Sequence, residues 1–219
     1  MKPLLATLDE AQRDLWNDLA PAARLGFVLY GGTAVALRYG HRRSIDFDFF
    51  TDRVLDKDAM RSAMPFLRRA TVLQDSVNTL TVLTATSRPV KCSFFGSLSI
   101  GRVGEPEMTE DGVLVVASSL DLLATKWKAI FDRIEAKDYL DIAAIVRGGT
   151  PLDSGLAAGR ALFGLAFQAS EALKALVYFH GGDLHELSTE DREYLIAAAS
   201  AVRRIPAMQR VSSSLSAFS

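Results

Sequence analysis

The stretch that decides the fold is Leu29-Tyr30-Gly31-Gly32-Thr33, followed by Ser44-Ile45-Asp46-Phe47-Asp48-Phe49-Phe50. The first segment is an apolar run that ends in a glycine pair and a threonine, which predicts a strand leading into a short helix. The second segment predicts a strand with aspartates at alternate positions. Because side chains alternate between the two faces of a strand, Asp46 and Asp48 should point the same way.

The aspartate pair predicts a cation site. Carboxylates side by side on one sheet face repel each other, so they must be solvated, protonated or bridged by a cation. Hard oxygen ligands favour Mg²⁺, which keeps several waters and shares its remaining positions with substrate phosphates. Asp46 and Asp48 are therefore the expected magnesium ligands. An acidic edge strand without a ligand is the alternative.

The glycine pair fits a phosphate site beside these carboxylates. Glycine allows positive φ and lets phosphate approach the backbone closely, and the N-terminus of the following helix offers unpaired N–H groups. We therefore expect Gly31 and Gly32 to cradle phosphate, with the Thr33 hydroxyl as an added donor. Alone, such a segment is more often a plain strand-to-helix turn, and the aspartate strand after it favours the functional interpretation.

These segments resemble the nucleotidyltransferase superfamily with the DNA-polymerase-β-like fold. Their form is most similar to the AbiEii/AbiGii-type nucleotidyltransferase toxins of bacterial abortive-infection and toxin–antitoxin systems. A second block resembles the same family: Asp121-Leu122-Leu123-Ala124-Thr125-Lys126, then Arg133, then Lys137-Asp138-Tyr139-Leu140-Asp141-Ile142. The resemblance covers residues 25–147.

The resemblance implies Mg²⁺-dependent transfer of a nucleoside monophosphate from an NTP to RNA, such as a tRNA 3′ end, or to a protein hydroxyl. It implies that Lys126 stabilises developing charge, and that Asp138 is a general base or the partner of Lys126. Ser44, in the same motif as the aspartates, is expected among the nucleotide-binding residues. A cognate antitoxin encoded nearby is the partner that the family implies.

The helix predicted over residues 120–131 carries Lys126 on its apolar face, at helical spacing from Leu122 and Ile130. A lysine there is unusual unless it is paired or functional, so we expect it to point into the active cleft. A lysine extending from the helix edge to solvent is the alternative. Asp138 and Asp141 could instead be carboxylates favoured at a helix N-terminus, and Asp141 could pair with Arg133.

Ser93 departs from the superfamily pattern, which commonly places a third acidic residue at this point. Serine is a poor metal ligand, so the metal has two carboxylates, or takes a third ligand from elsewhere, or catalysis is weakened or lost. Lys91 shares a face with Ser93 and is a candidate phosphate contact, whereas Cys92 faces the other way and is expected in the core. Residues 41–43 (His-Arg-Arg) are either a solvated loop or a contact for phosphate or RNA.

Two other functions remain open. One is a superfamily enzyme that modifies a small molecule, such as an antibiotic hydroxyl. The other is a nucleotide-binding or protein-interaction module that has lost catalysis, which Ser93 motivates.

Composition narrows the class of protein. The 219 residues carry a formal net charge of −1, so no global basic field indicates nucleic-acid binding. A single cysteine rules out an internal disulfide framework and fits a reducing compartment. The start of the chain lacks signal-peptide features, and no apolar run approaches a membrane span. We expect a soluble cytoplasmic protein.

The predicted fold class is α/β (α+β): a polymerase β-like core with a mixed sheet over residues 1–149 and a helical C-terminal extension over residues 150–219. Within the core, the pattern predicts helices over residues 8–19 and 56–69 and an antiparallel meander over residues 71–95. The serine-rich tail to Ser219 is expected to fray.

Overall fold

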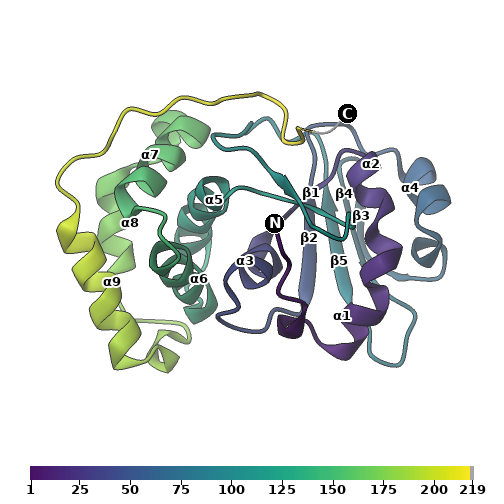
Figure 1. Cartoon of the computed structure of the whole chain (residues 1–219), viewed down its shortest axis with the longest axis horizontal. Coiled ribbons are helices and arrows are strands. Elements are labelled where there is room, and N and C mark those ends of the chain that lie inside the picture. Colours follow the sequence, from purple (N-terminus) through teal and green to yellow (C-terminus); the bar gives the residue numbers. More distant parts are fainter. Residues whose placement is uncertain (218–219) are drawn as a thin grey trace.

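The protein, described over residues 1–217 by a computed structural model, is built on one mixed sheet with helices on both faces (Figure 1). The seven strands lie in the order β3-β4-β5-β2-β1-β7-β6. Their bounds are β1 Val28–Tyr30, β2 Asp46–Phe50, β3 Thr71–Ser76, β4 Thr79–Leu83, β5 Lys91–Phe95, β6 Glu107–Met108 and β7 Val115–Val116. The predicted mixed α/β class is confirmed.

The centre of the sheet sets the positions of the acidic side chains. β2 pairs antiparallel with β1 and parallel with β5, which places Lys91 beside Asp46 and Ser93 beside Asp48. β3, β4 and β5 form the predicted antiparallel meander. The alternate residues Phe47 and Phe49 are fully buried on the opposite face.

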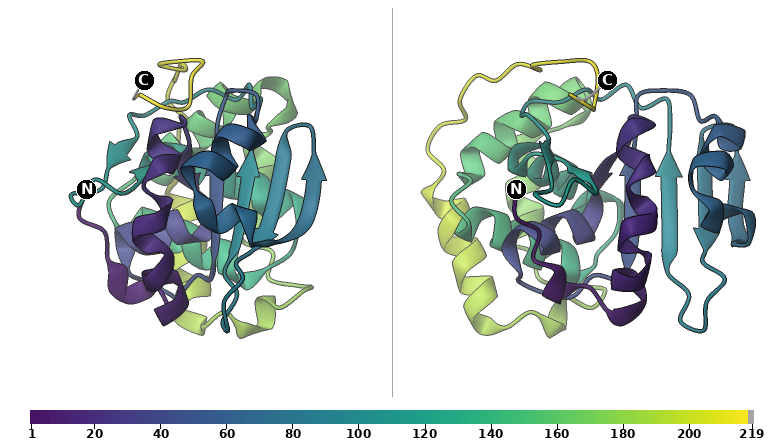
Figure 2. Two further views of the ribbon diagram at one scale, coloured as in Figure 1. Left: turned by 90° about the vertical axis from the view of Figure 1, so that its right-hand side faces the viewer. Right: turned by 45° about the vertical axis from the view of Figure 1, so that its right-hand side comes forward.

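More helices lie on one face of the sheet than on the other (Figures 1 and 2). α3 packs between the sheet and the pair α5 and α6, and α7, α8 and α9 lie outside that pair. α1 covers the other face, where Trp16 at its end packs against Phe47. The bounds are α1 Glu10–Leu15, α2 Pro21–Arg24, α3 Gly31–Tyr39, α4 Lys57–Ala63, α5 Ser119–Asp132, α6 Ala136–Arg147, α7 Leu152–Phe163, α8 Ala169–Leu176 and α9 Thr189–Ala201.

Local sequence explains where these helices begin and end. Asp9 caps α1 through a reciprocal capping box with Gln12, and Gly40 ends α3 in the left-handed conformation at φ 69°. Two predicted helices are shorter than expected. The first tightens into the 3₁₀ helix η2 (Trp16–Leu19), and the second stops before Pro65, where the 3₁₀ helix η3 (Pro65–Arg68) begins.

The C-terminal tail packs back onto the rest of the chain between Arg210 and Ser216, so the prediction that it frays is wrong for this segment. It returns from α9 across the molecule to the sheet (Figure 1). Arg102 donates to the Ser214 carbonyl at 2.7 Å, the Leu215 N–H donates to Asp52 at 2.9 Å, and the Leu215 side chain is 0% exposed. Residues 218–219, which the same prediction included, lie outside the described range.

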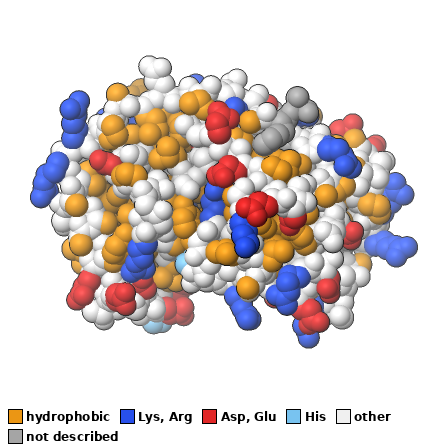
Figure 3. Space-filling view, viewed as in Figure 1, with side chains coloured by type: hydrophobic (Ala, Val, Ile, Leu, Met, Phe, Trp, Pro, Cys, Tyr) orange, Lys and Arg blue, Asp and Glu red, His pale blue; other side chains and the backbone are white. Residues whose placement is uncertain are grey.

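The division predicted at residue 149 stays a prediction. α7 packs closely on α5, where a Cβ at Gly155 would contact Leu123. No helix within residues 1–217 is long and apolar enough to cross a membrane. On the face that Figure 3 shows, acidic and basic side chains are interspersed.

Candidate active site

The two aspartates of β2 lie on one face of the sheet, as predicted. Asp46 pairs with Lys91 across the strands, with Oδ2 and Nζ 2.7 Å apart. Burial raises the pKa of Asp48, and the neighbouring negative charge of Asp46 raises it further, against Lys91, Lys126 and a hydrogen bond to Ser93. The ionised form of Asp48 is therefore disfavoured, and a bound cation would relieve this repulsion.

The N-terminus of α3 meets Asp48 directly. Gly31 has φ 72°, and a Cβ there would contact the Asp48 carboxylate. A Cβ at Gly32 would contact the Arg42 guanidinium and would lie 3.0 Å from the Ser44 hydroxyl oxygen. The glycines belong to the first turn of α3, not to a turn before it. They bring unpaired helix N–H groups close to the acidic strand.

Thr33 has a different neighbour from the one expected. Its hydroxyl donates to the backbone carbonyl of Asp46, and its side chain is almost fully buried. This contact holds β2 against α3, and it uses the proton that a phosphate would have accepted.

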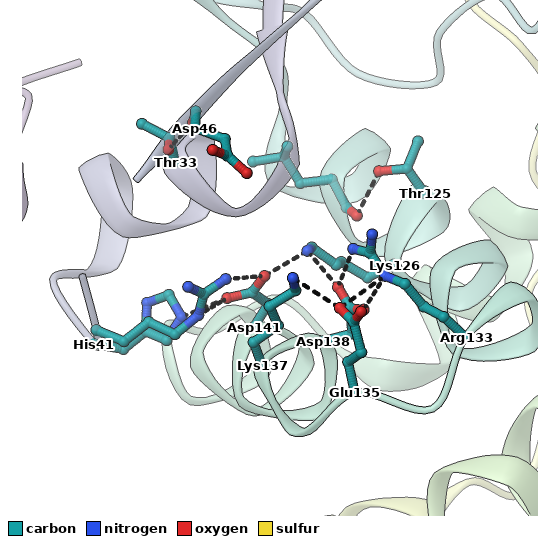
Figure 4. A network of polar contacts seen from close by, with 12 residues as sticks. Thr33, His41, Asp46, Thr125, Lys126, Arg133, Glu135, Lys137, Asp138 and Asp141 are labelled. Atoms are coloured by element: carbon teal, nitrogen blue, oxygen red, sulfur yellow. Dashed lines mark hydrogen bonds and ion pairs between the residues drawn. The ribbon is translucent and has the colours of Figure 1, made fainter. Parts of the chain in front are cut away.

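Lys126 of α5 points inward, and its side chain is buried (Figure 4). Its ammonium lies 2.7 Å from Asp138 and 2.5 Å from Asp141, both on α6. Lys126 also lines a cavity of about 480 Å³ together with Gly31 and Asp48. The predicted inward orientation therefore agrees with the structure.

Asp138 lies behind this cavity and is fully buried. Arg133, at the end of α5, donates to it from Nε at 2.8 Å and from Nη2 at 3.1 Å. Although burial raises the pKa of Asp138, hydrogen bonding to Arg133 and the charge of Lys126 hold it below its usual range. Asp138 is thus a carboxylate anchored by two cations.

Asp141 gathers the basic cluster that precedes β2. Arg42 contacts both of its carboxylate oxygens, at 2.7 and 2.9 Å, and His41 Nε2 lies 2.7 Å away. Burial raises the pKa of Asp141, but His41, Lys126 and Arg42 together lower it strongly. The proposed pair between Asp141 and Arg133 does not form; Arg133 binds Asp138 instead. The sequence showed the cluster but not its partner.

Comparisons with known proteins identify the family of this chain. The profile of the family described as "Nucleotidyl transferase AbiEii toxin, Type IV TA system" matches residues 13–209. The chain belongs to the AbiEii nucleotidyltransferase toxin family.

Two individual proteins are similar to this AbiEii-family chain. An uncharacterized protein of Aquifex aeolicus (strain VF5) is 35% identical over 123 residues, which are 55% of this chain and 58% of that protein. A crystal structure from H. pylori, of a protein assigned as a nucleotidyltransferase, superposes with a TM-score of 0.56 at 20% identity. It covers 86% of this chain and 90% of its own, and at this identity it supports the fold alone.

The cavity of the AbiEii-family chain joins a charged end to an apolar wall. Lys126 and Arg133 line it beside Asp48, and the wall contains Phe50, Phe95, Leu98, Ile100 and Phe163. A larger cavity of about 710 Å³ lies between α1, η3 and the β4–β5 connection. It contains none of the predicted site residues, so the smaller cavity is the candidate active site.

The residues present fit one divalent cation. Within residues 1–217 no cluster of three or more histidine, cysteine or acidic side chains could hold a metal. Asp46 and Asp48 nevertheless offer oxygens on one face, with Gly31 leaving open the space in front of Asp48. Two carboxylates leave positions for water and phosphate, which is the usual mode of Mg²⁺ binding.

Proposed function

We propose that this chain is a Mg²⁺-dependent nucleotidyltransferase that moves a nucleoside monophosphate from an NTP to an acceptor. One observation carries the proposal: Asp48, the Gly31 helix N-terminus and Lys126 line one cavity, and Asp46 lies on the same face of β2 as Asp48. Carboxylates, backbone N–H groups and an ammonium are the groups that a metal-bound triphosphate requires.

Each group has an assigned role. Asp46 and Asp48 would hold Mg²⁺, which when bound would polarise the α-phosphorus and neutralise the pyrophosphate leaving group. The backbone at Gly31 and Gly32 binds phosphate oxygens, and Ser44, close to Gly32, supports that turn. Phosphoryl-type transfer depends mainly on positioning and charge, so no covalent nucleophile is required.

Lys126 supplies positive charge to the transferring group, and Asp138 holds it there. A carboxylate with a lowered pKa and two cationic partners is a weak base. We therefore favour Asp138 as the partner of Lys126 and Arg133 over a role as general base. In this role it keeps both cations on the cavity wall.

The proposed acceptor is RNA, with a tRNA 3′ end as one candidate, or a protein hydroxyl, in the cytoplasm, with an antitoxin as the controlling partner. The apolar wall with Phe95 and Phe163 favours a second candidate, a small-molecule acceptor. A third candidate is a nucleotide-binding module with weakened catalysis. It is favoured by Ser93, which lies opposite Asp48 where a third acidic residue was expected.

The test uses purified protein, Mg²⁺ and each α-³²P-labelled NTP in turn, with total tRNA, cell lysate or an aminoglycoside as acceptor. The Asp46→Asn/Asp48→Asn double variant is the control. Label on an acceptor with the wild type, reduced about 100-fold or more in the variant, would support the proposal and identify donor and acceptor. Nucleotide binding without transfer would point to the non-catalytic module.

A further inference from the structure

Two side chains of β5 face the aspartates across the sheet, and neither is acidic. Lys91 is directly opposite Asp46 and Ser93 directly opposite Asp48 in the parallel register. In two-metal sites a pair of cations about 3.5–4 Å apart clamps the attacking and leaving oxygens. Two carboxylates provide few oxygen ligands for a second cation. On the neighbouring strand β5, the position opposite Asp46 holds Lys91, which offers no oxygen ligand.

The two lysines near the aspartates differ in burial and in the number of their acidic partners. Lys126 is buried and engaged by Asp138 and Asp141. Lys91 contacts Asp46 alone among the described acidic side chains, and it is 38% exposed. Its ammonium can therefore keep Asp46 as a partner and still donate to an oxygen of a nucleotide bound at the two aspartates, because an ammonium has three donors.

We propose that the Lys91 ammonium takes the place of a second divalent cation, so that this chain binds one divalent cation per nucleotide. This inference rests on the proposed function, and it gives Ser93 and Lys91 a common explanation. A fixed positive charge beside Asp46 neutralises it without needing oxygen ligands of its own. Lys91 is a compact point charge, as suits such a replacement.

A plain cross-strand ion pair is the competing explanation. Exposed pairs of this kind contribute about 0–1 kcal/mol to stability and have no effect on cation binding elsewhere. The two explanations differ in what neutralising Lys91 does to the number of bound cations.

The experiment counts Mn²⁺ ions per chain by electron paramagnetic resonance, at saturating non-hydrolysable α,β-methylene NTP, including the ion that the nucleotide carries. Four proteins are compared: wild type, Lys91→Met, Lys91→Arg and Lys128→Met. Lys128 is the control, because it is a lysine of the cavity lining that pairs with Asp132 and not with Asp46. Circular dichroism confirms that each variant is folded.

We expect one ion in the wild type, in Lys91→Arg and in Lys128→Met, and two ions in Lys91→Met. Two ions in the wild type would overturn the inference and leave the proposed function intact. One ion in both wild type and Lys91→Met would reduce Lys91 to a cross-strand pair. If no protein binds Mn²⁺ or nucleotide, the proposed function itself fails, which separates the two failures.

Discussion

Arg42 holds Asp141 by two parallel contacts, Nε to Oδ1 at 2.7 Å and Nη2 to Oδ2 at 2.9 Å. Asp141 is fully buried on α6, while Arg42 belongs to the segment that leads into β2. Planar guanidinium–carboxylate pairs of this kind are the strong ones. The pair fixes the helical layer to the acidic strand, so the distance between Lys126 and the aspartates depends on it.

Arg42→Gln should therefore destabilise the fold by about 1.5–3 kcal/mol, because the buried carboxylate loses two charge-assisted hydrogen bonds while it keeps Lys126 and His41. Urea unfolding at neutral pH measures the change. Arg43→Gln is the matched control, because the Arg43 side chain is exposed and has no ion-pair partner in the described part of the chain. Equal stability of the two variants would contradict the assigned role of Arg42.

The pH dependence of stability should follow Asp138 and Asp141. Both folded pKa values lie below the ordinary value of 3.8, so the unfolded chain binds protons first as pH falls. Their contribution is present above that value and is lost as pH decreases through and below it. Urea midpoints at pH 7 and pH 3.5 measure the loss. In Asp138→Asn the difference between the two midpoints should be smaller; an unchanged difference would exclude Asp138 as a source.

Asp48→Asn should abolish transfer and raise the stability of the metal-free protein. Because the pKa of Asp48 is raised in the folded state, its ionised form at neutral pH opposes folding, and the amide removes that charge at similar volume. The gain should be on the order of 1 kcal/mol. Thermal melting in EDTA tests it, with the same melts in Mg²⁺ for comparison. A lower melting temperature in EDTA would show that the carboxylate stabilises the fold.

Gly31→Ala should affect both stability and transfer, and Gly112→Ala separates the causes. The two glycines have nearly the same φ, 72° and 73°, but a Cβ at Gly112 has nothing within 4 Å, whereas one at Gly31 would meet Asp48. Both variants should lose about 1–2 kcal/mol from backbone strain. Only Gly31→Ala should also lower transfer, by about 100-fold, through displacement of Asp48. Equal transfer rates in the two variants would argue against Asp48 as a metal ligand.

The parts of the site that are local in sequence could be predicted. Alternation along β2 placed Asp46 and Asp48 on one face, and helical spacing turned Lys126 inward. The polymerase β-like fold was expected from the resemblance of the same segments to the nucleotidyltransferase superfamily, and the mixed α/β class is confirmed.

The rest depends on contacts between distant residues. Arg42 and Asp141 are 99 positions apart, and no local pattern states which acid meets which base. Likewise, the serine-rich composition of the tail indicates fraying, but burial of Leu215 and its backbone contact with Asp52 outweigh that preference. Pro65 lies inside the helix predicted over residues 56–69, and the α-helix ends before it because proline lacks the backbone N–H and clashes with the preceding turn.

The tail has a consequence for the order of assembly. Leu215 and Asp52 are 163 positions apart, and the same tail contacts Arg102 and the Ser99 carbonyl, next to the cavity residues Leu98 and Ile100. Contacts of such long sequence separation form slowly. During synthesis the central sheet can pair while residue 215 is still inside the ribosome. The part of the cavity wall formed by Leu98 and Ile100 should therefore reach its final position late. In a growing chain, the acidic strand β2 would be in place before the cavity is complete.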